Sequence, residues 1–262
     1  RWVAAQSRLR DRVRVPALLA DDDRGNQIVE DLGARDLAST LTASESGREA
    51  WLARAADAAA AIAAMPDPGI NPAFDAALFV RELDLAREAV FDLLLGAPLT
   101  PAERECHDAW ARGLVAEILE HPAALCHRDF HANNLFASGE QIGVIDFQDL
   151  RRGPDAYDLA SLLWERTTLD WMSEEIAASV VERFAARRGV EAAALAARLR
   201  RVLLQRAWKV CGTFARAVAQ GAAMAPQTET ARLAWARGEI CGDKAEAIAA
   251  AVADLPEASD PT

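Results

Sequence analysis

The stretch CHRDFHANNLF (residues 126–136) and, after a gap of six residues, GVIDFQD (residues 143–149) decide the fold of this chain. In the first stretch, His127 and Asp129 are two residues apart, and Asn134 follows the aspartate by five. Apolar residues stand at both ends, so a polar loop between two apolar segments is expected. One interpretation is a plain turn, in which the aspartate and asparagine side chains bond to nearby backbone or cap a helix.

A second interpretation of this loop is chemical. Transfer of a phosphoryl group needs a carboxylate that orients the attacking hydroxyl and accepts its proton, and a nearby amide oxygen that helps to hold Mg²⁺. Asp129 and Asn134 supply both groups. Asp146 ends a β-branched apolar run directly before Phe147, where kinases carry a metal-binding aspartate, although Gln148 replaces the glycine of the Asp-Phe-Gly pattern. The two segments together favour the chemical interpretation.

A third segment, RGPDAYDLASLL (residues 152–163), predicts a helix that follows a Gly-Pro turn. Asp158 near its start is expected to cap the helix and also to brace the loop that carries Asp129. His127 is assigned to the same supporting role. His131 has a side chain that titrates near neutral pH, but Asp129 already occupies the position of the base, so we assign His131 to loop stabilisation or substrate contact.

Composition narrows the class of protein. The chain has 262 residues, of which 52% are hydrophobic and 26% charged, which is typical of a soluble globular protein with one large domain or two small ones. A formal net charge of -11 argues against a nucleic-acid partner. The four cysteines form no C-x-x-C pair, so neither a zinc site nor a disulfide framework is indicated. Without a membrane-length apolar run, a signal peptide or any evident protein-partner motif, a cytoplasmic protein is expected.

Local patterns predict a mostly helical chain with a hairpin near its start and two short strand pairs around the catalytic motif. Thr100 and Pro101 mark a helix start. The expected elements are the end of a helix at 1–12, a hairpin within 13–33, helices at 45–64, 74–95 and 101–120, a strand at 141–147, a helix from 158, and helical residues 173–252 with breaks near Gly189, Pro226 and Gly242.

Four segments carry a resemblance to a known family. HRDFHANN, VIDFQD, RGPDAYDLASLL and LLQRAWKVCGTFARA (residues 203–217) resemble, in order and spacing, the aminoglycoside phosphotransferase-like kinases, and most closely the bacterial anomeric kinases of N-acetylmuramate and N-acetylglucosamine in cell-wall recycling. The similarity runs from about residue 1 to about residue 240. It implies an α+β, protein-kinase-like fold with a mostly helical C-terminal lobe, ATP and Mg²⁺ as cofactors, and a small-molecule sugar as the acceptor.

The resemblance also implies roles for individual residues. Asp129 corresponds to the catalytic base, and Asn134 and Asp146 correspond to the magnesium ligands. The backbone groups expected to bind adenine are those of Glu30, Asp31 and Leu32. Side chains that either line a sugar pocket or belong to the core and the solvated surface are Trp164, Glu165, Arg166 and Trp171, and the same two interpretations apply to Arg206, Trp208 and Lys209.

One departure concerns the N-terminal lobe. The family carries a phosphate-covering loop and a lysine there, whereas the lysines of this chain are Lys209 and Lys244, both after Asp129. We therefore expect residues 1–33 to be the remnant of a truncated N-terminal lobe with its hinge, and residues 34–262 to form the C-terminal lobe. An upstream extension of roughly 60 to 80 residues is expected in the gene.

Two alternatives to the amino-sugar kinase stay open. The first keeps the fold and the chemistry but changes the acceptor to an aminoglycoside or a choline-like cation, for which the acidic composition is a mild argument. The second is a nucleotide-binding pseudokinase with little or no turnover. The missing lysine favours the pseudokinase, and the presence of Asp129, Asn134 and Asp146 opposes it.

The 262-residue chain alone is predicted to fold its helical part but to transfer phosphate very slowly. Asp129 and Asp146 bring negative charge to an anionic nucleotide, and each lost lysine or backbone N–H contact to phosphate costs on the order of a hundredfold or more in rate. Steady-state ATP turnover of this chain, beside that of the protein with any upstream extension, tests the prediction. Equal rates would contradict it.

Overall fold

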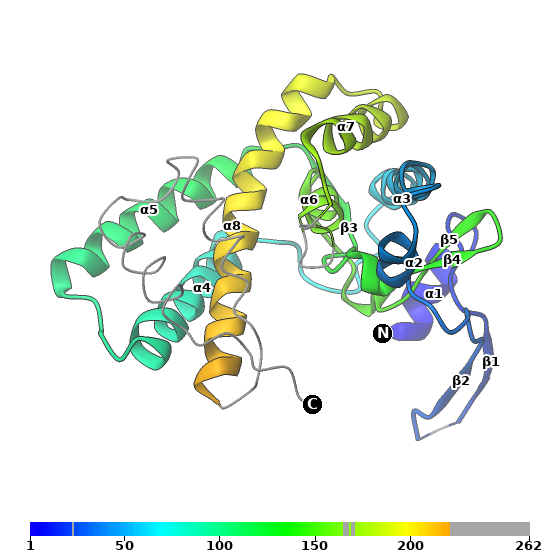
Figure 1. Ribbon diagram of the computed structural model, residues 1–262. Helices are drawn as coiled ribbons and strands as arrows, with labels where there is room; N and C mark the ends of the chain where they lie inside the picture. The colour runs from blue at the N-terminus through cyan, green and yellow to red at the C-terminus, as the bar shows by residue number, and fades with distance from the viewer. Residues whose placement is uncertain (23, 165–167, 169–170, 221–262) are drawn as a thin grey trace, which may run out of the picture. The chain divides into compact units, whose positions relative to one another are not determined.

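The computed structural model describes residues 1–22, 24–164, 168 and 171–220 (Figure 1). Contacts along the chain divide it into two compact units, each built from two separate segments. Unit 1 comprises Arg1–Phe74 and His121–Leu199, and unit 2 comprises Asp75–Glu120 and Arg200–Thr262. This division differs from the lobe boundary expected at residue 33, which stays a prediction.

Unit 1 contains three two-stranded antiparallel sheets among its described residues. Each sheet pairs two strands: β1 (Leu18–Asp21) with β2 (Gln27–Val29), β3 (Ala123–Cys126) with β6 (Arg151–Pro154), and β4 (Leu135–Ser138) with β5 (Gln141–Val144). The β1–β2 hairpin turns at Asp22, whose carboxylate accepts the N–H groups of Arg24 and Asn26. The hairpin and the two strand pairs around the motif are therefore confirmed.

Unit 1 also contains five α-helices among its described residues, apart from the part of α8 that belongs to it. They are α1 (Trp2–Leu9), α2 (Leu37–Ala43), α3 (Arg48–Ala63), α6 (Tyr157–Leu163) and α7 (Glu174–Arg188). The alanine-rich α3 packs along α7, because small side chains allow two helices to approach closely. Asp57 on α3 accepts hydrogen bonds from both Arg183 and Arg187 of α7, and this pairing holds the pKa of the Asp57 carboxyl well below its usual range.

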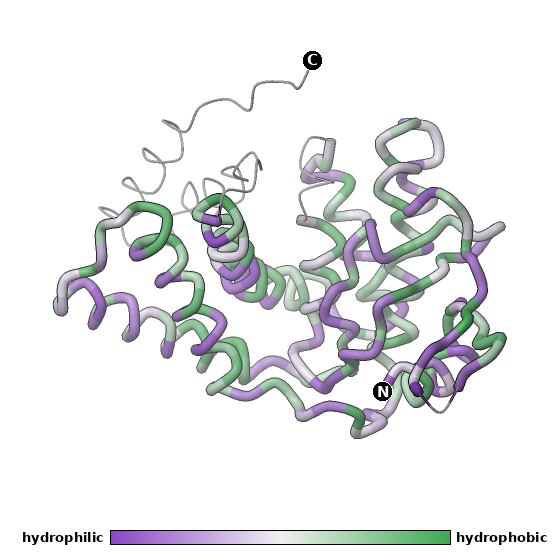
Figure 2. The backbone as a smooth tube through the Cα atoms, turned by 90° about the horizontal axis from the view of Figure 1, so that it is seen from below, coloured by the Kyte–Doolittle hydropathy of each residue, from purple (hydrophilic) through white to green (hydrophobic). Residues whose placement is uncertain are grey.

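Unit 2 contains α4 (Ala76–Arg87), a π-helical continuation (Glu88–Leu94), α5 (Pro101–Leu119) and the part of α8 (Ala192–Ala219) that begins at Arg200. Hydrophobic and hydrophilic residues alternate along its helices (Figure 2), as expected for helices buried on one face. Trp208 is a core residue here: it is 4% exposed, and its indole N–H donates to the carbonyl of Leu83 at 3.3 Å.

Most of the expected helices are confirmed, with ends that shift by a few residues. Thr100 caps α5 and exchanges hydrogen bonds with Glu103, and Gly189 ends α7 in the left-handed region. Helix α2 was not among the expected elements, and no residue range was expected for β6. The strand expected to reach Asp146 ends at Val144 instead, because Asp146 leaves the extended conformation. The breaks expected near Pro226 and Gly242 lie outside the described residues.

Among the helices that the structure describes, none combines the length and the apolar character needed to cross a bilayer.

Replacement by alanine is expected to change the free energy of unfolding in opposite directions at two helical glycines of unit 2. A Cβ at Gly212 of α8 would lie 2.3 Å from the Cα of Ala86, whereas a Cβ at Gly113 of α5 would meet nothing within 4 Å. Gly212→Ala is therefore expected to lower the free energy of unfolding, by about 1–3 kcal/mol. Gly113→Ala is expected to raise it by about 0.5–1 kcal/mol, through helix propensity alone.

Urea denaturation followed by circular dichroism measures both effects, with Gly113→Ala as the matched control. Equal shifts in the same direction would show that α4 and α8 do not approach closely at Gly212.

Candidate active site

The loop of residues 127–134 is anchored by one buried carboxylate from the following helix. Asp158 stands at the second position of α6 and is 5% exposed. It accepts the backbone N–H of His127 at 2.6 Å and that of Arg128 at 2.9 Å. Both of these hydrogen bonds join the Asp158 carboxylate of α6 to the loop, as the bracing role predicts.

The His127 side chain joins this loop to the strand that leads to Asp146. It is fully buried, and its Nε2 lies 2.9 Å from the carbonyl oxygen of Ile145. Because a carbonyl only accepts hydrogen bonds, Nε2 carries the proton. The backbone N–H of Ile145 in turn donates to the carbonyl of Asn134 at 3.0 Å. These two bonds place the loop and the start of the GVIDFQD turn side by side.

Asn134 is oriented by its neighbours in the loop. Its Nδ2 donates to the carbonyl of Asp129 at 2.9 Å and lies 3.4 Å from Nε2 of His131. Since Nδ2 is used inside the loop, Oδ1 is the side-chain atom of Asn134 that remains to bind a cation. The structure therefore brings Asp129, His131 and Asn134 together on one short turn.

Asp146 adopts a left-handed backbone conformation, with φ 61° and ψ 34°. Non-glycine residues rarely take this conformation, and it often marks functional turns. A short 3₁₀ turn, Phe147–Asp149, follows at once. The carboxylate of Asp146 is exposed, and its Oδ1 accepts a hydrogen bond from Nε2 of Gln148 at 2.6 Å.

Arg128 is the second non-glycine residue with positive φ among the described residues, at 82°. Its guanidinium Nη1 donates to Oδ2 of Asp149 at 2.8 Å, and its carbonyl accepts the hydroxyl of Ser161 at 3.3 Å. The guanidinium also lies over the ring of Phe74, 5.6 Å from the centroid. Contacts from three segments thus fix the backbone immediately before Asp129.

Two of the predicted hinge residues, Glu30 and Leu32, are connected to strand β5, Glu30 through Arg14 and Leu32 directly. The Glu30 carboxylate accepts hydrogen bonds from both terminal nitrogens of Arg14, and this pairing lowers the Glu30 pKa to about 2. The carbonyl of Arg14 accepts the N–H of Val144 at 2.8 Å. Leu32 packs on Gly143, where an added Cβ would lie 2.8 Å from the leucine Cδ1. Gly143 therefore leaves room for the hinge beside the strand that leads to Asp146.

Fewer contacts are described for Asp31, the third predicted hinge residue, and for the predicted pocket residues. Asp31 accepts the N–H of Gly33 at 2.8 Å in a tight turn. Trp164 ends α6 and is half-buried, whereas Glu165 and Arg166 lie outside the described residues. The ring of Trp171 stacks under the guanidinium of Arg48, 4.4 Å from the centroid.

In unit 2, Lys209 pairs with Glu82 at 3.0 Å and Arg206 is buried. Arg206 and Trp208 belong to the interior of that unit, whereas the Lys209 side chain is 27% exposed. Sugar-binding roles for Arg206, Trp208 and Lys209 therefore have no support from these contacts.

Several contributors to the site gave no sequence signal. Asp36, which caps α2, accepts the Nδ2 of Asn133 at 2.8 Å. Burial would raise the pKa of Asp36, but hydrogen bonds from Ser39 and Asn133 outweigh that effect and lower it. Asn71 bonds to the turn after Asp146 from far along the chain. Only Gly143 carried a sequence signal, because a glycine inside a strand often marks a place where another segment approaches closely.

The oxygen atoms of Asn134 and Asp146 suit a hard divalent cation. Mg²⁺ prefers oxygen ligands and is commonly held by one or two carboxylates together with substrate phosphates. The exposed Asp146 carboxylate and the Oδ1 of Asn134 supply such atoms from two adjoining turns. The described residues therefore fit a magnesium site at this position.

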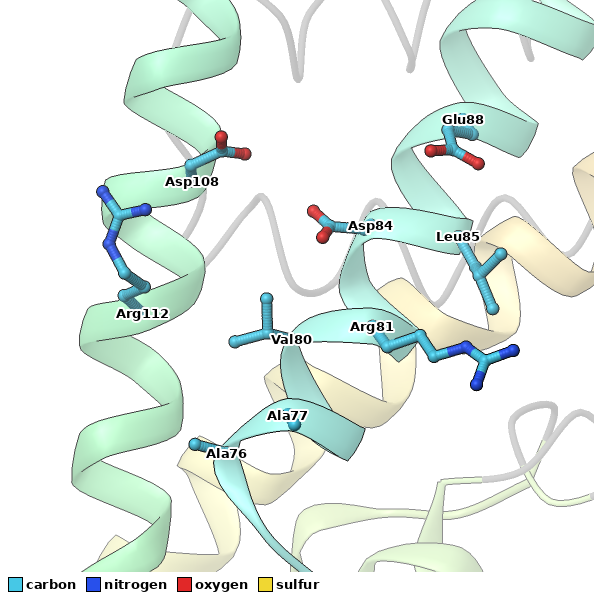
Figure 3. A pocket seen from close by; sticks show the side chains of 9 residues that line it. All are labelled: Ala76, Ala77, Val80, Arg81, Asp84, Leu85, Glu88, Asp108 and Arg112. Carbon is cyan, nitrogen blue, oxygen red and sulfur yellow. The ribbon is translucent and has the colours of Figure 1, made fainter.

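A separate groove of about 660 Å³ lies within unit 2, between α4 and α5. Figure 3 shows Asp84 of α4 and Asp108 of α5 pointing toward each other across it. Ligand atoms of Asp84, His107 and Asp108 all lie within 4.8 Å of one another. Each has a protein partner: Asp84 lies 3.9 Å from Nε of Arg87, and His107 Nδ1 lies 3.3 Å from Asp108. We interpret these contacts as internal charge balance.

Comparison with known proteins shows related sequences over most of the chain. A sequence model described as the phosphotransferase enzyme family matches residues 1–201. An N-acetylmuramate/N-acetylglucosamine kinase of Neisseria meningitidis serogroup B is 32% identical over 180 residues, which cover 68% of this chain and 53% of the relative. The chain spans about half the length of the curated relatives it matches.

Solved structures show the same fold at low sequence identity. A choline/ethanolamine kinase family protein from Mesorhizobium loti superposes with a TM-score of 0.63 at 17% identity, covering 95% of this chain and 81% of that one. The gentamicin complex of APH(2″)-IIa gives a TM-score of 0.58 at 17% identity, covering 95% and 77%.

The stability of unit 2 is predicted to depend on pH through His107. Burial lowers the pKa of His107, against the opposing effect of its hydrogen bond to Asp108. The unfolded chain, with a histidine pKa near 6.5, then binds a proton more readily than the folded protein. The contribution of His107 is thus fully present above about pH 6.5 and declines as the pH falls below that value.

His107→Gln removes the titrating group. As the pH falls from about 7 to about 5, the wild type is expected to lose unfolding free energy relative to this variant, so the difference between the two proteins changes with pH. The depressed carboxyl of Asp57 titrates below this window. Urea midpoints at several pH values measure the difference, and a difference that does not change with pH would refute the assignment.

Proposed function

The chain belongs to the phosphotransferase enzyme family and has its protein-kinase-like fold, as the sequence predicted, and from this premise we propose that it takes part in ATP-dependent phosphorylation of an amino sugar. The acceptor is N-acetylmuramate or N-acetylglucosamine, and the reacting atom is the anomeric oxygen. The single observation that carries the proposal is the pairing of an Asp129–Asn134 loop with Asp146 through hydrogen bonds on both sides of Ile145. A cytoplasmic role in cell-wall recycling goes with this acceptor.

Asp129 acts as the general base in this proposal. It accepts the proton of the attacking hydroxyl and orients that oxygen toward the phosphoryl group. An anomeric hydroxyl is more acidic than an ordinary alcohol, so one well-placed carboxylate is a sufficient base. The backbone before Asp129 is fixed by Asp158 and by the ion pair between Arg128 and Asp149, and such rigidity lowers the cost of reaching the reactive geometry.

Asn134 and Asp146 would hold the metal of the nucleotide through their oxygen atoms. When bound, Mg²⁺ neutralises charge on the phosphates and stabilises the charge that develops during transfer. The protein keeps these two side chains in place by the carbonyl of Asp129, which takes the Asn134 amide, and by Gln148, which takes one oxygen of Asp146.

Backbone groups of Glu30, Asp31 and Leu32 bind the adenine. The N–H of Glu30 already donates to the carbonyl of Ala17 at 2.9 Å, so its carbonyl is the atom left for the base. The Leu32 side chain, packed on Gly143, anchors this segment beside β5. His131 serves the loop or the acceptor, and Trp164, Glu165 and Arg166 are proposed to contact the acceptor.

The acceptor is tested by ADP release with a panel of substrates, in the protein expressed from its complete reading frame. N-acetylmuramate and N-acetylglucosamine are expected to support turnover, and kanamycin and choline to support little or none. Phosphate at the anomeric position is identified by ³¹P NMR of the product. A clear preference for a cationic acceptor would favour the aminoglycoside or choline alternative, and no turnover with any acceptor would favour the pseudokinase.

Replacement of Asp129 or Asp146 by Asn is expected to lower kcat by about a hundredfold or more, because each removes a group that acts in the transition state. Cooperative unfolding should persist in the Asp146 variant, since that side chain is exposed. Asp149→Asn serves as a comparison that perturbs only the support of Arg128. Wild-type rates in either catalytic variant would refute the site.

A further inference from the structure

Asp146 needs support that its own backbone does not provide. Its left-handed conformation is unfavourable for a residue with a side chain, so such a turn persists only where surrounding contacts determine it. Its carboxylate is exposed to solvent, and an exposed carboxylate is otherwise free to rotate. A metal ligand in this position therefore requires a second group that fixes the orientation of its oxygens.

Gln148 supplies the first contact. Its Nε2 donates to Oδ1 of Asp146 at 2.6 Å, a short hydrogen bond to a charged acceptor. An amide nitrogen only donates and a carboxylate oxygen only accepts, so the contact ties Oδ1 of Asp146 to the side chain of Gln148. It uses one lone pair of Oδ1 and leaves the capacity of Oδ2 for a cation.

Asn71 supplies the second contact, from a segment 77 residues earlier. Its Nδ2 donates to the carbonyl of Gln148 at 2.9 Å and to that of Leu150 at 3.0 Å, so one amide group bonds both to the middle of the 3₁₀ turn that follows Asp146 and to the residue after that turn. Asn71 is 6% exposed. The segment continues to Phe74, whose N–H donates to the carbonyl of Arg152 at 2.8 Å, which ties it to β6.

We propose that Asn71 and Gln148 are positioning residues that set the Asp146 carboxylate for metal binding, with Asn71 holding the backbone of Gln148 and Gln148 holding the carboxylate. This inference rests on the proposed function, because it takes Asp146 to be the metal ligand. The glutamine that replaces the glycine of the Asp-Phe-Gly pattern thus has a specific role. Loss of either side chain weakens metal binding more than it weakens nucleotide binding.

The test is a titration of the protein–ADP complex with Mn²⁺. The electron paramagnetic resonance signal of free Mn²⁺ measures how much of the ion is bound. Gln148→Met keeps the length of the side chain and removes the donor, and it is expected to raise the Mn²⁺ dissociation constant about tenfold or more. Gln141→Met, at an exposed glutamine of β5, is the matched control and should bind Mn²⁺ as the wild type does. Asn71→Ala is expected to act in the same direction as Gln148→Met.

A kinetic measurement separates positioning from a general loss of structure. In Gln148→Met the Mg²⁺ concentration for half-maximal rate should rise, while the urea midpoint and the affinity for ADP without metal stay near wild type. If Asn71→Ala does not fold, Gln148→Met alone decides the matter. An unchanged Mn²⁺ dissociation constant in Gln148→Met, beside a large loss in Asp146→Asn, would overturn the positioning role and leave the proposed function intact. Unchanged binding in Asp146→Asn as well would overturn both.

Discussion

The two hydrogen bonds that Asp158 accepts from the backbone of His127 and Arg128 are the constraint on which the site depends. They hold a backbone that turns into a left-handed conformation at Arg128, immediately before Asp129. Removal of the carboxylate would leave the buried N–H of His127 without this acceptor, which costs about 1–3 kcal/mol. The ring of His127, bonded to Ile145, then carries this fixed geometry across to the turn at Asp146.

The supporting groups of the site and the groups assigned to chemistry differ in their burial. The atoms that hold the loops are buried backbone groups and buried side chains such as Asn71 and Asp158. Of the groups assigned to chemistry, Asp129 and Asn134 are half-buried, and the Asp146 carboxylate is exposed at the end of these supports. Such an arrangement separates stability from catalysis, because substitution of an exposed carboxylate removes few packing contacts.

Sequence patterns predicted those parts of the fold that depend on local chemistry. The caps at Thr100 and Gly189, the hairpin and the long helices follow from residue type and spacing. The sequence could not predict that Asn71 holds the turn at Gln148, or that Asp36 holds Asn133, because these contacts join residues far apart in the chain. The sequence was enough to identify the motif residues. The hydrogen bonds that orient them could be identified only from the tertiary structure.

The interruption of unit 1 by the segment Asp75–Glu120 has a consequence for synthesis of the chain. Helix α3 packs on α7, and their ion-pair partners Asp57 and Arg183 are 126 residues apart. A ribosome therefore releases α3 long before α7 exists to cover it, and the first segment of unit 2 emerges in between. During this interval the apolar face of α3 is exposed to other chains. We therefore expect the yield of folded protein to depend on translation speed and chaperone access as well as on the final stability.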